Sequence, residues 1–157
     1  MRDQVGPSMA VGAVAAFLIL FGLGIAFEGS LANKVTFTDP ATTVEDWRHR
    51  YRMALAFSSG MLAVLTLFWL WQAHKGHGLN SKAGTWLSLL AFAVLVSIGL
   101  FWFYTSDLRE GFGLEMLVIG IASLLAYWIS TLFVTPTQYK FTPWLASVFL
   151  GPGKNSR

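Results

Sequence analysis

Four long runs of apolar residues constrain this chain more than any other feature of its sequence. They cover residues 9–27, 53–71, 85–104 and 114–134. Each is close to the roughly 20 residues that a helix needs to cross the hydrocarbon of a bilayer. Only 12% of the residues are charged, whereas a soluble domain carries about 25%. The pattern predicts an all-α integral membrane protein, a bundle of about four transmembrane helices in one domain over residues 1–157.

The two ends of the chain carry weaker signals. The flank Met1-Arg2-Asp3 has little charge, and the first apolar run exceeds the roughly 7–15 residues of a signal-peptide core. We therefore expect this run to be retained as a transmembrane span. Residues 141–150 are apolar but too few to cross, so they predict a short C-terminal segment in the membrane interface.

The orientation follows from the basic residues, because cytoplasmic loops of membrane proteins carry an excess of Lys and Arg. Four spans place both termini on one side, which holds six basic residues, namely Arg2, Lys75, Lys82, Lys140, Lys154 and Arg157. The opposite side holds five, namely Lys34, Arg48, Arg50, Arg52 and Arg109. We predict a multi-pass protein of a bacterial inner membrane, with both termini in the cytoplasm.

The loop before the second span predicts an early helix start. Thr42 and Glu45 have the spacing of a capping box, in which a hydroxyl and a carboxylate satisfy free backbone N–H groups. A helix of about 30 residues from near residue 43 would place Arg48, Arg50 and Arg52 at the level of the lipid headgroups. Two interpretations stay open for these arginines: contact with lipid, or docking of a partner subunit.

Small residues spaced four apart mark places where membrane helices approach closely. The fourth span carries such a seam at Ala122, Ala126 and Ser130. The first span carries two, Ser8/Gly12/Ala16 and Gly22/Ala26. These seams predict either packing within one bundle or contact with another membrane subunit.

No residue pattern assembles a catalytic centre, so we expect no catalytic residue in this chain. The absence of cysteine excludes disulfides and thiolate metal sites. His74 and His77 share a helical spacing, but a stable metal site needs a third or fourth ligand, so they are weak metal candidates. All three histidines lie at span ends, where a haem held inside the bundle would find no axial ligand. We expect no cofactor bound by this chain alone.

The charged residues exclude other classes of function. No Asp, Glu, Lys or Arg lies near the middle of a span, although proton relays and ion pathways nearly always need such groups. Glu115 stands in the first turn of the fourth span, where the helix dipole favours an anion. The net charge of +3 is spread between the spans and does not indicate nucleic acid.

One family resemblance rests on residues 39–71. An outer loop with Asp39 and Pro40 precedes a helix that opens Val44-Glu45-Asp46-Trp47-Arg48 and ends Trp69-Leu70-Trp71, and Thr105-Ser106-Asp107 follows the third span. This layout resembles the early helices of the membrane subunits of copper membrane monooxygenases, the methane- and ammonia-oxidising family. The Asp-x-x-x-His pattern of that family's copper site is missing here, so the resemblance implies a non-catalytic companion.

Together these features predict a non-catalytic accessory subunit of a larger membrane complex. A bioenergetic oxidoreductase is the expected kind: a membrane monooxygenase, a respiratory complex or a photosynthetic one. Its partners would be other membrane subunits and phospholipids. Two alternatives stay open, a small homo-oligomeric transporter or channel, and a membrane anchor that binds quinone or haem at a span end.

Overall fold

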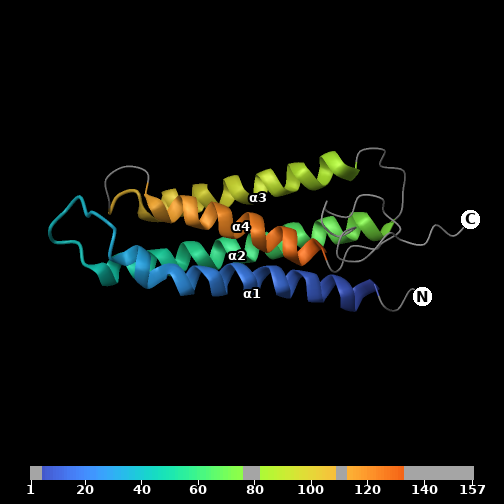
Figure 1. Cartoon of the computed structure of the whole chain (residues 1–157), viewed down its shortest axis with the longest axis horizontal. Coiled ribbons are helices and arrows are strands. Elements are labelled where there is room, and N and C mark those ends of the chain that lie inside the picture. Colours follow the sequence, from blue (N-terminus) through green and yellow to red (C-terminus); the bar gives the residue numbers. More distant parts are fainter. Residues whose placement is uncertain (1–4, 76–81, 109–112, 133–157) are drawn as a thin grey trace, which may run out of the picture.

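The computed structural model describes residues 5–75, 82–108 and 113–132, and over these residues the protein is all-helical. Figure 1 shows its four helices, which are α1 (Val5–Ala32), α2 (Val44–Lys75), α3 (Lys82–Thr105) and α4 (Leu114–Leu132). Each is long and apolar enough to cross a membrane. The predicted four-helix membrane fold is therefore confirmed. The predicted segment 141–150 and the last two residues of the fourth span, 133–134, lie outside the described residues.

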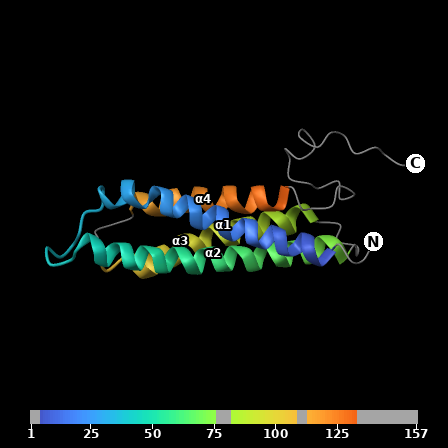
Figure 2. The same cartoon turned by 90° about the horizontal axis from the view of Figure 1, so that it is seen from below.

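The helices run alternately up and down and close into a ring. Each helix packs on the next one in sequence, α4 packs on α1, and α2 and α4 also touch across the bundle. Figures 1 and 2 show that the loop from α1 to α2 lies at the same end of the bundle as the start of α4. We call this end the loop end.

The helix α2 begins one residue later than the predicted capping box would place it. Thr43 and Asp46 form the box: the Asp46 N–H donates to Thr43 Oγ1 at 3.2 Å, and the Thr43 N–H donates to the Asp46 carboxylate at 3.1 Å. The prediction of Thr42 with Glu45 was wrong because the Thr42 N–H already donates to the Asp39 carbonyl at 3.0 Å. That turn leaves Thr43 as the residue that caps the helix.

The interior of the bundle is filled by aliphatic side chains alternating with small residues. Fully buried large side chains include Leu20, Leu55, Leu62, Met116 and Ile119. The predicted seam of α4 is buried as well, with Ala122, Ala126 and Ser130 turned into the bundle. These three residues therefore pack within this chain, which is the first of the two interpretations of the seam.

Two glycines of α1 lie close against α2: Gly12, which the small-residue pattern selected, meets Leu70, and Gly24, which the pattern did not select, meets Leu55. A Cβ added to Gly24 would overlap the side chain of Leu55, whereas one added to Gly22 would meet no atom within 4 Å. Gly22 and Ala26 are exposed, so they do not pack within this bundle. Residues two apart lie on nearly opposite sides of a helix, and α1 turns Gly24 inward.

Candidate functional site

Charged side chains gather at the loop end and tie three helices together. The arginines of the first turns of α2 reach carboxylates on α1 and on the segment after α3. Arg48 and Arg52 are four residues apart and share the face of α2 that meets Glu28, whereas Arg50 diverges from each of them by about 200°. The result is a layer of ion pairs between helices, at the level where the sequence predicts headgroups.

Glu28, in the last turns of α1, is the most buried member of this layer. It is only 5% exposed and accepts two hydrogen bonds from Arg52, from Nε at 2.9 Å and from Nη2 at 2.9 Å. Arg48 Nε lies 3.6 Å from the same carboxylate, and Arg48 Nη1 contacts Glu45 at 3.4 Å. A carboxylate held by two guanidiniums fixes the end of α1 against the start of α2.

Arg50 makes the corresponding link to the other side of the bundle. Its Nη1 donates to both oxygens of Asp107 at 2.9 and 2.7 Å, joining α2 to the segment after α3. The side chains of Arg50 and Asp107 are 42% and 57% exposed. Water therefore screens this ion pair more than it screens the pair of Arg52 with the buried Glu28.

The three arginines thus have a role that neither sequence interpretation considered. Arg48, Arg50 and Arg52 pair with carboxylates of their own chain. Sequence reasoning missed Glu28 and Asp107 as their partners. A signal existed, because an acid near the end of one helix faces a base near the start of the next when two helices form an antiparallel hairpin.

An aromatic layer lies directly beneath the charges. The rings of Trp47 and Tyr51 lie tilted against each other with centres 4.8 Å apart, and Tyr51 meets Phe101 of α3 edge-on at 5.1 Å. All three side chains are fully buried. The Tyr51 hydroxyl donates to the Gly24 carbonyl at 2.9 Å, so the polar group of the Tyr51 side chain has a hydrogen-bond partner inside the bundle.

Glu115 is a second buried carboxylate at the loop end. It stands in the first turn of α4, as predicted, where the helix dipole stabilises a negative charge. Its side chain is almost completely buried and folds back over Gly113, where an added Cβ would overlap the carboxylate. Glycine at this position therefore makes room for the acid.

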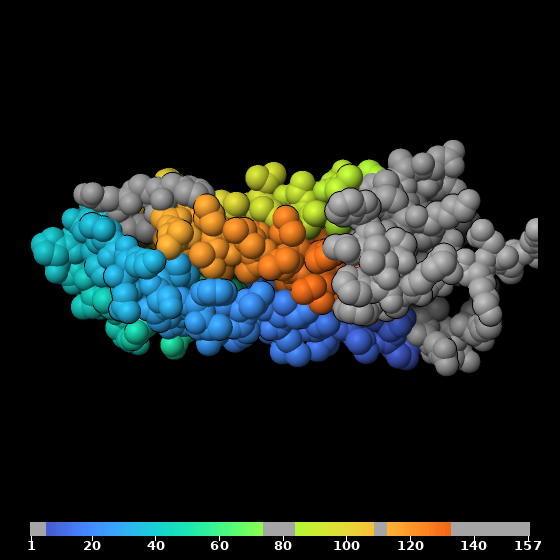
Figure 3. Space-filling view, viewed as in Figure 1, coloured from blue at the N-terminus to red at the C-terminus, as the bar shows by residue number. Residues whose placement is uncertain are grey.

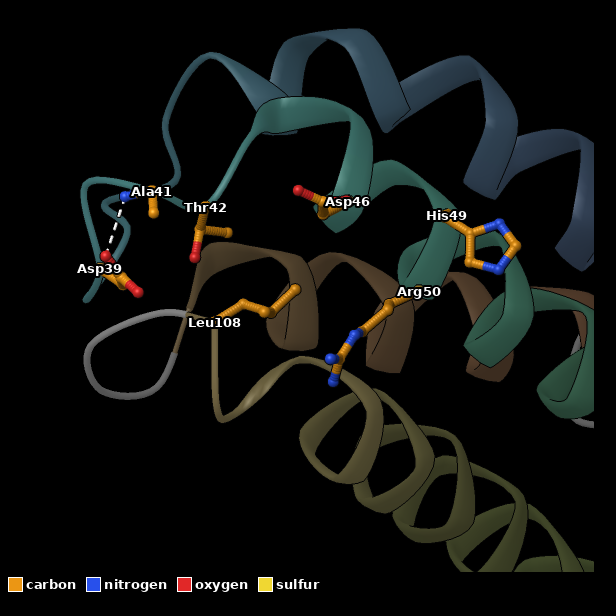
Figure 4. A pocket seen from close by; sticks show the side chains of 7 residues that line it. All are labelled: Asp39, Ala41, Thr42, Asp46, His49, Arg50 and Leu108. Carbon is orange, nitrogen blue, oxygen red and sulfur yellow. Dashed lines mark hydrogen bonds between the residues drawn. The ribbon is translucent and has the colours of Figure 1, made fainter.

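Two hollows open at the loop end on either side of Arg50. The loop hollow, of about 320 Å³, lies between the α1–α2 loop, α2 and Leu108, as Figure 4 shows. The α2–α3 hollow, of about 400 Å³, lies beside it. His49 and Arg50 line both. The other lining residues of the loop hollow are Asp39, Ala41, Thr42, Asp46 and Leu108, and those of the α2–α3 hollow are Met53, Phe103, Tyr104, Ser106 and Asp107.

The predicted metal candidates fall outside what the structure describes. His77 and the side chain of His74 are not among the described residues. Within the described residues, no group of three or more His, Asp or Glu side chains is arranged to hold a metal ion. The chemistry that the loop end offers there is hydrogen bonding and charge pairing with a polar ligand.

No protein family, curated protein or solved structure matches this chain.

Proposed function

We propose that this chain is a non-catalytic accessory subunit of a larger membrane complex. The observation that carries the proposal is the apolar outer surface of α1 and α3. Large side chains project from it, including Leu95 at 67% exposure, with Val11, Leu18 and Leu87 also well exposed. Figure 3 shows α1 and α4 forming one long face of the molecule. A helix with apolar residues on its outer face can be buried against another membrane subunit as readily as against lipid.

The packed interior supports a subunit role more than a role as a channel for ions or protons through a single bundle. Leu20, Leu55, Leu62, Met116 and Ile119 fill the centre between the helices. The charged residues of the described helices lie toward the ends of the bundle. A pathway for ions or protons needs polar or ionisable groups along its length. A homo-oligomeric transporter would have to form its pathway between copies of the chain.

The kind of complex is inferred from the resemblance of residues 39–71 to membrane subunits of copper membrane monooxygenases. We infer a bioenergetic oxidoreductase in which the catalytic ligands belong to other subunits. In this proposal the ion pairs and aromatic layer at the loop end keep the bundle rigid, so that its outer faces present a fixed shape to the neighbouring subunit.

Photo-crosslinking tests the proposal directly. Benzoylphenylalanine at Leu95, on the exposed face of α3, should form an adduct with a different polypeptide when membranes are illuminated. The same group at Phe101, which is fully buried in the same helix, is the matched control and should give no intermolecular adduct. The adducts are identified by mass spectrometry after extraction in a mild detergent.

The outcomes separate the alternatives. Adducts between two copies of the chain, with a native-gel band at a small multiple of 17.3 kDa, would replace the subunit proposal by the homo-oligomeric transporter. Adducts with lipid alone would contradict a partner at this face. A Soret band that stays with the purified chain would favour the haem anchor.

A further inference from the structure

The α2–α3 hollow changes from polar to apolar along the membrane normal. His49, Arg50, Ser106 and Asp107 line its outer part, whereas the aromatic side chains of α3 line its inner part. His49 lies about 6 Å beyond Met53 along α2, which is close to the thickness of the headgroup layer on one side of a bilayer. The hollow therefore crosses the boundary between headgroups and hydrocarbon.

The inner wall of the hollow is a continuous aromatic surface. Phe103 and Tyr104 meet edge-on with ring centres 5.4 Å apart, and Tyr104 stacks on Phe57 of α2 at 5.8 Å. Phe103, Phe57 and Met53 are exposed to the surroundings of the bundle. Such a surface between two helices suits the glycerol and upper acyl carbons of a lipid.

The outer wall offers charges of both signs. Arg50 contacts Asp107 through Nη1 alone, and within the described part of the chain its Nε and Nη2 donate to no other residue. These nitrogens and His49 can donate to a phosphate. Asp107 lines this hollow beside Arg50, so one carboxylate and one guanidinium stand side by side there, whereas Asp39 and Asp46 line the loop hollow on the other side of Arg50. Figure 4 shows Asp39, Asp46 and Arg50 around the loop hollow.

This balance of charge selects among phospholipids. The Asp107 carboxylate repels a headgroup that is only negative, such as that of phosphatidylglycerol. A headgroup with both a phosphate and a primary ammonium complements this pair of opposite charges, because its ammonium can donate to Asp107 while its phosphate accepts from Arg50 and His49.

We propose that the α2–α3 hollow is a specific site for a zwitterionic aminophospholipid, with its phosphate at Arg50 and His49, its ammonium toward the carboxylate of Asp107, and its upper acyl chain against Phe103. The site is independent of the accessory-subunit proposal, because it is complete within this chain.

Native mass spectrometry of the purified full chain in a non-ionic detergent tests the site. Phosphatidylethanolamine, phosphatidylcholine and phosphatidylglycerol are titrated separately, and the bound fraction is measured at each concentration. Phosphatidylethanolamine should bind about tenfold more tightly than phosphatidylglycerol, the difference expected from one charge-assisted hydrogen bond. Phosphatidylcholine should bind less well than phosphatidylethanolamine, because its methylated amine cannot donate hydrogen bonds.

Variants locate the site. His49→Gln and Phe103→Ala should each weaken phosphatidylethanolamine binding, whereas Phe92→Ala, an exposed residue of α3 that does not line the hollow, should leave it unchanged. Asp107→Asn should shift the preference toward phosphatidylglycerol, since it removes a negative charge and frees Arg50. Circular dichroism confirms that each variant is folded.

Two results would overturn the assignment. The first is binding of phosphatidylglycerol as tight as that of phosphatidylethanolamine in the unaltered protein. The second is equal retention of phosphatidylethanolamine by the unaltered protein, His49→Gln and Phe103→Ala. Equal binding of the choline and ethanolamine lipids would contradict the placement of the ammonium at the carboxylate of Asp107.

Discussion

At the scale of single residues, Glu28 differs from Glu45 and Asp107, the other acids that pair with the three arginines, by its burial. It is almost fully enclosed and accepts two hydrogen bonds from Arg52. A buried carboxylate that loses its charge leaves its donors without an acceptor of equal strength. The pair of Arg50 and Asp107 also has two hydrogen bonds, both from Nη1, but it is exposed to water, so it serves as a comparison.

Glu28→Gln should lower the free energy of unfolding by about 1–3 kcal/mol, because it weakens the hydrogen bonds of a buried charged group. The matched change Asp107→Asn should cost less than about 1 kcal/mol, as is usual for exposed pairs. Both values can be measured by unfolding the detergent-solubilised protein with increasing denaturing detergent. A larger loss for Asp107→Asn than for Glu28→Gln would show that burial does not set the strength of these pairs.

Several buried hydroxyls behave differently from the Tyr51 hydroxyl. The hydroxyls of Ser58, Ser59, Thr66 and Ser123 are buried, and in the described part of the chain none has a hydrogen-bond partner. An unsatisfied buried hydroxyl destabilises a fold unless a water molecule bonds to it.

Ser123→Ala should therefore leave stability unchanged or raise it slightly, by up to about 1 kcal/mol. Tyr51→Phe should lower stability by about 1 kcal/mol, because it removes the hydrogen bond to the Gly24 carbonyl. Thermal unfolding followed by circular dichroism compares the two variants. If Ser123→Ala proves as destabilising as Tyr51→Phe, the Ser123 hydroxyl must have a bonding partner, such as an internal water molecule.

At the scale of helices, α1 approaches α2 closely at two glycines, Gly12 against Leu70 and Gly24 against Leu55. Gly24 faces Leu55, which is fully buried and has little room to move. The same stretch of α1 also supplies the Gly24 carbonyl to Tyr51 and the Glu28 carboxylate to Arg52. A shift of α1 away from α2 at this level would thus disturb three contacts together.

Gly24→Ala should destabilise the bundle by about 1–3 kcal/mol through overpacking. Gly22→Ala, two residues away on the exposed side of the same helix, should have no such effect and gains helix propensity. Thermal melting of the two variants under the same conditions measures the difference. Equal melting temperatures would mean that Leu55 moves aside without cost.

At the scale of the whole molecule, the four helices place the first and last described residues at the end opposite the loop end. The side of the membrane on which the termini lie remains a prediction from the basic residues. The chain contains no cysteine, so a single introduced cysteine reports on one position without interference.

Cysteines placed one at a time at Asn33 and Asn80 should react with a membrane-impermeant maleimide from opposite sides of the membrane. Asn33 follows α1 in the loop to α2, and Asn80 falls in the chain between α2 and α3. With cytoplasmic termini, Asn33 should be labelled in intact cells and Asn80 only after the membrane is opened. The reverse pattern would invert the orientation, and labelling of both in intact cells would contradict four spans.

The sequence alone determined the number of spans, their approximate limits and the early start of α2. These features depend on local chemistry: the length of an apolar run against the thickness of a bilayer, and the hydroxyl and acid before a helix. The one-residue error in the predicted start of α2 also has a local cause. The turn from Asp39 to Thr42 sets the position of the cap and depends on no tertiary contact.

Only the tertiary structure decided which face of each helix turns inward. In the folded bundle Gly24 faces α2 while Gly22 faces outward, and Glu28 and Glu115 are buried. Arg50 pairs with Asp107, and Arg52 pairs with Glu28. The physical reason is that α1 and α3 are apolar around most of their circumference, so no polar face marks the side that meets lipid. Their rotation is fixed by shape and by hydrogen bonds between helices, which involve residues far apart in the sequence.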